Sequence, residues 1–133
     1  MTRWPANYRN LALWTLQGWL AMFFLAAGYA KLTEPMDMLV ILLSWPAHVA
    51  PEVVRALGAA EVLLAISVLA PLFSRSLGRP VLVLAAMAML ALETAMLVIH
   101  VVSFEWGHVA TNLALVLITT TVFMQRTREA SAG

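Results

Sequence analysis

Two glutamates, Glu61 and Glu93, stand inside long apolar stretches of the sequence. A carboxyl group in such surroundings is costly unless it faces other protein groups or water, so each one marks a candidate site. There it can exchange a proton with a bound substrate, or it can tie two helices together by hydrogen bonding. Glu61 and Glu93 are therefore the candidate catalytic residues, and an interhelical structural role is the alternative for both.

Further polar residues recur at helical spacing in the same stretches. Stepping each stretch by about 100° per residue places its polar groups on one narrow face. The four faces contain Gln17, Phe24, Gly28 and Lys31; Gly58, Glu61 and Ala65; Met89, Glu93, Met96 and His100; and His108, Asn112, Leu115 and Thr119. Turning all four faces inward keeps the polar groups away from lipid, so we expect them to meet inside a helical bundle.

The depth of each polar group follows from a rise of about 1.5 Å per residue, counted from the outer end of its helix. On this scale Glu61 and Glu93 both lie roughly 13 Å deep, whereas Lys31, His100 and His108 lie near the outer boundary. This predicts a polar funnel that opens outward and binds a polar head group or relays protons. Lys31 is the cation expected to neutralise Glu61, with His108 and Asn112 as further donors. The candidate ligand-binding residues are Gly28, Lys31, Gly58, Glu61, Glu93, His100, His108 and Asn112.

The sequence contains no cysteine, which excludes disulfides, thiolate metal sites and iron–sulfur ligation by this chain. A haem between His100 and His108 is not favoured, because the short connection between their helices keeps both side chains at the rim. A metal held by Glu61, Glu93 and a histidine is not favoured either, since none of the predicted spans contains an E-x-x-H pair of the kind found in such sites. The sequence therefore predicts no metal ligands and no haem.

Composition places the chain in a membrane. Hydrophobic residues make up 62% of its 133 residues and charged residues only 11%, against about a quarter charged in ordinary soluble domains. We expect a single all-α domain over residues 1–133, built as an integral membrane four-helix bundle. The predicted spans cover about residues 11–30, 53–70, 81–102 and 106–124. Between the first two, the apolar run from Met38 to Leu43 is too short to cross, which predicts a short interfacial or re-entrant segment.

Basic residues predict the orientation, because cytoplasmic connections carry an excess of lysine and arginine. One side of the predicted bundle receives only Lys31 and Arg55. The other side receives Arg3, Arg9, Arg75, Arg79, Arg126 and Arg128. We therefore expect a multi-pass protein with both termini in the cytoplasm and the lipid bilayer as its surroundings. A cleaved signal peptide is the alternative for the first stretch, which is however longer than the core of a usual signal. The net charge of +1 gives no reason to expect nucleic acid binding.

Two short motifs resemble those of a known family. Residues 28–32 have the sequence G-Y-A-K-L at the end of the first span, and residues 57–61 have L-G-A-A-E in the second. In order and spacing they resemble the DoxX-like family of small four-span membrane proteins, and the resemblance covers about residues 11–124. By position it assigns motif roles to Gly28, Lys31, Gly58 and Glu61. The other four candidates, Glu93, His100, His108 and Asn112, rest on helical periodicity alone.

That superfamily is linked to quinone-coupled oxidation of sulfur compounds and to other membrane complexes. The resemblance therefore implies a common scaffold and does not imply one particular activity. Our first hypothesis is a small accessory or assembly subunit of a larger complex in a bacterial inner membrane. It would bind other membrane subunits or further copies of itself through a stripe of Ala88, Ala91 and Ala95. A quinone or lipid-like ligand would occupy the funnel.

The alternative is a membrane subunit of a quinone-linked oxidoreductase that uses Glu61 or Glu93 for proton exchange. Binding or transport of a small lipid-like substrate is a third hypothesis. Because the chain has no cofactor motif, it lacks the means to transfer electrons alone, which favours the accessory subunit. The sequence does not decide whether the chain itself is catalytic.

Overall fold

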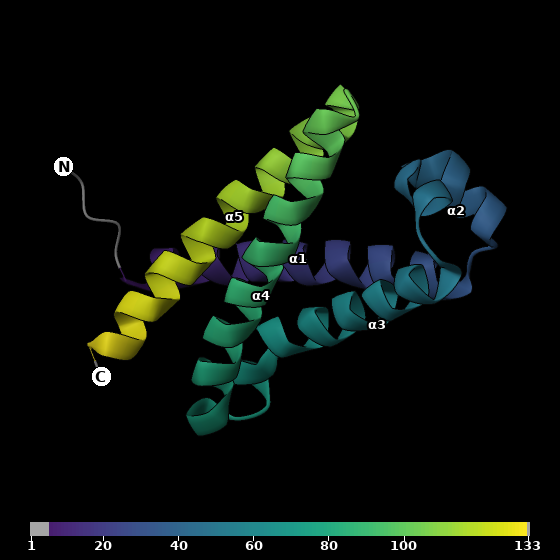
Figure 1. Cartoon of the computed structure of the whole chain (residues 1–133). Helices are drawn as coiled ribbons and strands as arrows, with labels where there is room; N and C mark the ends of the chain where they lie inside the picture. The colour runs from purple at the N-terminus through teal and green to yellow at the C-terminus, as the bar shows by residue number, and fades with distance from the viewer. Residues whose placement is uncertain (1–5, 133) are drawn as a thin grey trace.

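The computed structural model describes residues 6–132, which form five α-helices and two short 3-10 helices. The elements are α1 (Ala6–Thr33), α2 (Met36–Leu43), η1 (Trp45–His48), α3 (Pro51–Val68), η2 (Ala70–Leu72), α4 (Arg75–Val102) and α5 (Trp106–Ser131). The predicted all-α class is confirmed, and the short segment between the first two long helices consists of α2 and η1 (Figure 1). Arg3, which enters the prediction of orientation, lies outside the described residues.

Three helices, α1, α4 and α5, are long and apolar enough to cross a membrane by their length and composition. The fourth long helix, α3, has 18 residues and carries the charged residues Glu52, Arg55 and Glu61. At about 1.5 Å per residue α3 is still roughly 27 Å long, close to the ~30 Å of a bilayer's hydrocarbon core. The chain is a multi-pass helical membrane protein, and its fold agrees with the predicted bundle.

Long helices that are neighbours in the sequence pack side by side. α3 runs antiparallel along α1, and α5 runs antiparallel along α4, so the four helices form two pairs. Figure 1 shows the second pair crossing the first, and α4 also contacts α3 and η2. The core between the pairs includes Leu20 and Phe24 of α1, Met89 of α4 and Val122 of α5. These side chains hold the two pairs together.

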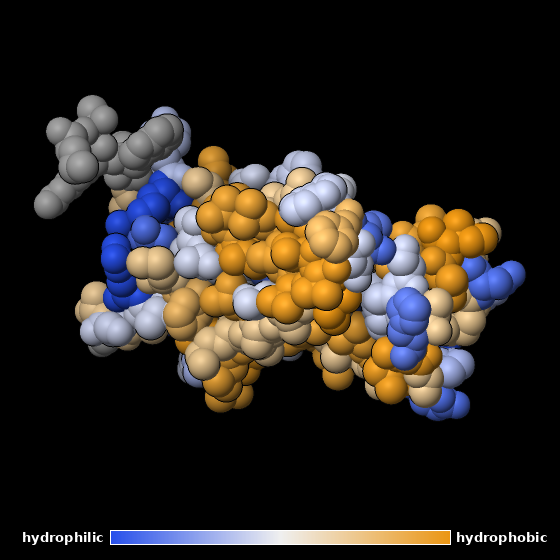
Figure 2. Space-filling model, turned by 45° about the horizontal axis from the view of Figure 1, so that its top comes forward, coloured by the Kyte–Doolittle hydropathy of each residue, from blue (hydrophilic) through white to orange (hydrophobic). Residues whose placement is uncertain are grey.

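The polar faces predicted from helical periodicity point into the bundle. Their buried members are Gln17, Phe24, Gly28, Lys31, Gly58, Glu61, Ala65, Met89, Glu93, His100, Leu115 and Thr119. His108 and Asn112 are half-buried. Apolar side chains instead cover much of the outside, and Figure 2 shows them across the middle of one face, with hydrophilic residues at both ends and the most strongly hydrophilic at one of them. The predicted inward turn of each polar face is confirmed.

α1 begins and α5 ends at the same end of the bundle, where Arg126 Nη1 lies 3.0 Å from Asn10 Oδ1. We call this the terminal end, and the opposite end, which carries α2, the α2 end. α4 begins at Arg75, earlier than the predicted third span, because the Ser74 hydroxyl accepts a hydrogen bond from the Leu77 amide at 3.3 Å and caps the helix. α5 continues to Ser131, beyond the predicted fourth span, since Arg126 anchors its last turns to α1.

Candidate functional site

Lys31 and Glu61 form a buried ion pair between α1 and α3. The Lys31 Nζ atom lies 2.9 Å from Glu61 Oε1 and 2.8 Å from Oε2. Only 6% of the lysine side chain and 9% of the glutamate side chain are exposed. Helical side chains lean toward the N-terminus of their helix, so on two antiparallel helices these residues lean toward each other. The expected neutralisation of Glu61 by Lys31 is confirmed.

Gly28 and Gly58 bring the two helices close enough to form this pair. A β-carbon on Gly28 would lie 2.6 Å from the Gly58 carbonyl oxygen and 2.8 Å from Cγ2 of Val62. A β-carbon on Gly58 would lie 2.8 Å from Lys31 Cβ and 2.9 Å from the Gly28 carbonyl oxygen. A larger residue at either position would push the backbones apart. Each glycine precedes a member of the ion pair by one helical turn. The motifs at residues 28–32 and 57–61 therefore form one contact between α1 and α3.

Arg55 adds a second link between α3 and α1. Its guanidinium donates from Nη1 to the Lys31 carbonyl and from Nη2 to the Glu34 carbonyl, the latter at 2.8 Å. The last carbonyls of a helix have no partner inside it, so Arg55 caps the C-terminus of α1. Sequence reasoning uses Arg55 only for orientation and misses this role. The position of Arg55 near the start of α3 was the available signal for this role. In an antiparallel pair, the start of α3 lies beside the end of α1.

Glu93 makes the corresponding contact between α4 and α5. The Thr119 hydroxyl donates to Glu93 Oε1 at 2.8 Å, and Glu93 is 2% exposed. The other carboxyl oxygen, Oε2, is buried and has no hydrogen-bond partner within residues 6–132. Glu93 therefore differs from Glu61, whose two oxygens both accept from Lys31.

His100, His108 and Glu105 gather where α4 turns into α5. His100 Nδ1 lies 2.5 Å from Glu105 Oε2, and the rings of His100 and His108 stack with their centroids 4.8 Å apart. The hydrogen bond with His100, and a further one with Ser44, hold the pKa of Glu105 below its usual value. Asn112 Nδ2 donates to the His108 carbonyl one turn earlier, at 2.9 Å. Through its contact with Ser44, Glu105 links the turn to the residue that follows α2.

Glu105 is a member of this cluster that sequence reasoning missed. The residue before it, Phe104, has a φ of 59°, and this left-handed conformation turns the chain sharply between the two helices. The turn brings the Glu105 carboxylate back to His100, which precedes it by five residues. The sequence did contain a signal for this contact, because Glu105 follows His100 by only five residues across a short connection.

The eight predicted site residues fall into three separate groups. The first group contains Gly28, Lys31, Gly58 and Glu61; the second contains Glu93; and the third contains His100, His108 and Asn112. Within the described part of the chain, no hydrogen bond or ion pair joins one group to another. In the same residues, no group of three or more histidines and carboxylates can hold a metal ion. Ligand binding by these residues stays a prediction.

These features define a class of protein: a small multi-pass helical membrane protein whose first two long helices share a glycine contact and a buried Lys–Glu pair. Residues 15–122 match the DoxX-like family, and the chain therefore belongs to the DoxX-like family. The predicted membership of this family is thereby confirmed. Neither a curated protein nor a solved structure matches the chain.

Proposed function

We propose that this DoxX-like protein is an accessory or assembly subunit that docks to another membrane subunit through α4. The observation that carries the proposal is a stripe of small residues on the outer face of α4, formed by Ala88, Ala91 and Ala95, all exposed. Small side chains let a neighbouring helix approach closely, and such contacts drive helix association in membranes. The chain's own bundle uses the same principle where Gly28 meets Gly58.

The polar groups inside the bundle support a scaffold role. Lys31 and Glu61 fasten α1 to α3, and Thr119 and Glu93 fasten α4 to α5. Each contact joins two helices, as interhelical hydrogen bonds do in membrane bundles. A rigid bundle of this kind presents its outer faces in a fixed geometry, which favours docking.

The substitution Ala91→Leu tests this proposal. Native membranes would be solubilised in a mild detergent, and the size of the complex would be compared by native electrophoresis. The wild-type chain should migrate in a complex, and Ala91→Leu should release it, because the added side chain separates the helices. Ala59→Leu, an equal change at an exposed position of α3, serves as the matched control and should leave the complex intact. A monomeric wild-type chain, or a complex unchanged by Ala91→Leu, would contradict docking through α4.

The second candidate function is that of a membrane subunit in a quinone-linked oxidoreductase, with electrons supplied by a partner. The Oε2 atom of Glu93 favours it, because this buried carboxyl oxygen has no hydrogen-bond partner within residues 6–132 and so has a free position for a proton. Glu93→Gln keeps the shape and the contact with Thr119 but removes the acid. Loss of quinone-linked activity in a correctly assembled complex would support this function, and full activity of the variant would contradict it.

The proposal also covers the orientation of the chain in the membrane. We infer that the terminal end faces the cytoplasm of a bacterium and that the chain resides in the inner membrane. The basic residues support this, since Arg75, Arg79 and Arg126 all line one pocket at the terminal end. Lys31 and Arg55 contribute the basic charge of the α2 end, and both are engaged in contacts between α1 and α3.

A further inference from the structure

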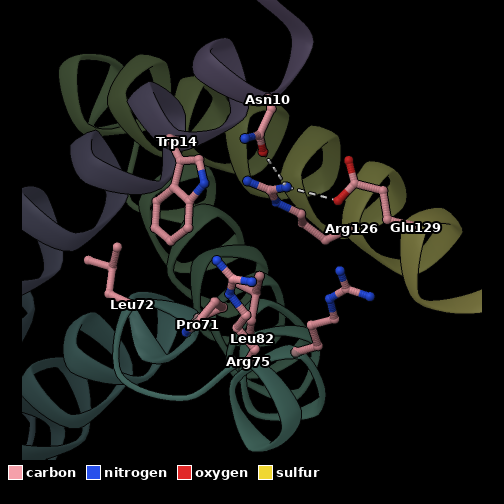
Figure 3. A pocket seen from close by; sticks show the side chains of 9 residues that line it. Asn10, Trp14, Pro71, Leu72, Arg75, Leu82, Arg126 and Glu129 are labelled. Carbon is pink, nitrogen blue, oxygen red and sulfur yellow. Dashed lines mark hydrogen bonds and ion pairs between the residues drawn. The ribbon is translucent and has the colours of Figure 1, made fainter. Parts of the chain in front are cut away.

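A pocket of about 530 Å³ lies at the terminal end, away from the three groups of predicted site residues (Figure 3). Residues of α1, η2, α4 and α5 line it, and three of them are arginines, Arg75, Arg79 and Arg126. In Figure 3, Trp14 and Arg126 lie on one side of the pocket, and Pro71 and Arg75 lie on the other. The pocket therefore has a strongly basic lining at the place where all four long helices end or begin.

Arg126 is held firmly in the wall of the pocket. Its Nε atom donates to Gln17 Oε1 at 2.8 Å, and its Nη1 atom donates to Asn10 Oδ1 at 3.0 Å and to Glu129 Oε2 at 2.8 Å. The guanidinium carbon also lies 5.5 Å from the centre of the Trp14 ring. Its Nη2 atom is buried and has no acceptor within the described residues. Arg126 is thus fixed in position by an ion pair with Glu129 and two further hydrogen bonds, and its Nη2 atom still has a donor to offer.

Arg75 and Arg79 stand on the first turns of α4 and are exposed. Across residues 6–132, neither forms an ion pair with a carboxylate. Gly78 places them beside the pocket, because a β-carbon there would lie 2.5 Å from the Pro71 Cα atom, so that α4 packs tightly on η2. Three arginines against the single carboxylate of Glu129 leave an excess of two positive charges in the lining.

The position of the pocket matches the level of lipid head groups. Next to the arginines, the exposed side chains of Leu72, Phe73 and Leu77 mark the border of the apolar surface. From Val81 onward α4 is continuously apolar up to Glu93. A basic pocket between helices at this border is suited to an anionic head group, and the planar fork of arginine fits phosphate oxygens.

We propose that this pocket binds the phosphate group of an anionic membrane lipid. Arg75 and Arg79 contact the phosphate oxygens, and the immobile guanidinium of Arg126 supplies further positive charge from the wall. The acyl chains extend from Arg79 along the part of α4 where Pro80, Val83 and Leu84 line the same groove. The residues that line the head-group pocket include neither Ala91 nor Glu93, so the proposal does not rest on docking through α4 or on proton exchange.

Native mass spectrometry of the full chain in a neutral detergent tests the proposal. Phosphatidylglycerol should be retained in preference to phosphatidylcholine, which has a phosphate but no net charge. The double variant Arg75→Gln with Arg79→Gln should weaken phosphatidylglycerol binding by about tenfold or more. Arg128→Gln removes an equal charge from an exposed residue of α5 outside this pocket and should leave binding unchanged. Circular dichroism would confirm that each variant is helical, and the two single variants replace the double one if it does not fold.

Two results would overturn the assignment. Equal binding of phosphatidylglycerol by the wild-type chain and the folded arginine variants would show that the pocket is not the site. If Arg128→Gln weakened phosphatidylglycerol binding as much as the pocket variants do, the binding would be a general attraction between a basic surface and an anionic lipid. Inorganic phosphate at the same concentration as the lipid should compete poorly. If it displaces phosphatidylglycerol completely, the pocket is a site for free phosphate and the lipid assignment fails.

Discussion

The carbonyl oxygen of Gly58 lies 2.6 Å from the point where a β-carbon on Gly28 would stand. The backbones of α1 and α3 therefore lie in close contact at these two glycines. Lys31 and Glu61 follow these glycines by one turn on their respective helices. The glycine contact therefore sets the distance between the helices at the place where the Lys31 ammonium group must reach the Glu61 carboxylate. The glycine contact and the ion pair are thus two parts of one helix interface.

Gly28→Ala should destabilise the protein, because the new methyl group would collide with the backbone of α3. We expect a loss of about 1–3 kcal/mol in the free energy of unfolding, measured by titration with sodium dodecyl sulfate in mixed micelles. Gly18→Ala on the same helix is the control, since its β-carbon would have no atom within 4 Å. That change should be neutral or stabilising by up to about 1 kcal/mol. Equal stability of both variants would refute the close contact.

Lys31→Met should be strongly destabilising, because it leaves the Glu61 carboxyl buried without its cation. Removing one member of a buried pair costs about 3–5 kcal/mol, whereas replacing both members by apolar residues is often close to neutral. Lys31→Met combined with Glu61→Leu should therefore lose less stability than Lys31→Met alone. The comparison uses the same unfolding titration for the single and double variants. Losses that simply add would show that the two side chains do not depend on each other.

Glu105 should make stability depend on pH. Its pKa in the folded protein lies below the ordinary value of 4.5, owing first to the hydrogen bond with His100. The unfolded chain therefore binds this proton more readily, so the stabilisation is complete above pH 4.5 and is lost as the pH falls through the lower folded pKa. Glu105→Gln should unfold at a lower temperature than wild type at pH 7, and the gap should narrow at about pH 3.5. A gap that stays constant across this range would count against the contact.

Single cysteines can establish the orientation, because the natural chain has none. Ser76→Cys at the terminal end and Thr33→Cys at the α2 end both introduce exposed thiols. A membrane-impermeant maleimide added to intact cells should label Thr33→Cys and should label Ser76→Cys only after the membrane is opened. Labelling of both positions from outside would refute the four-span arrangement.

Helical periodicity predicted which face of each helix turns inward because lipid offers no partner to a polar group. Gln17, Glu61, Glu93 and Thr119 are all buried as expected. Periodicity alone does not determine which helices are neighbours. The structure pairs α1 with α3 and α4 with α5, so Glu61 meets Lys31 whereas Glu93 meets Thr119.

Sequence reasoning missed several contacts made by residues near helix ends. The capping role of Arg55 requires the end of α1 to lie beside the start of α3, and the contact of Glu105 with His100 requires the turn at Phe104. Both depend on backbone geometry that composition does not report. Arg126 is a further case, since its partners Asn10 and Gln17 lie more than a hundred residues away in the sequence.

The division of the bundle into two pairs bears on how the chain enters a bilayer. Each pair is a helical hairpin that already contains partners for its own most costly groups, with Lys31 and Glu61 in the first and Thr119 and Glu93 in the second. Each hairpin can therefore insert with one hydrogen-bonding partner for its buried carboxyl group already in place. The contacts from Arg126 to Gln17 and Asn10 join the hairpins at the terminal end, where water at the membrane border can solvate these groups until the two halves meet. Insertion and assembly are thereby separable steps for this small protein.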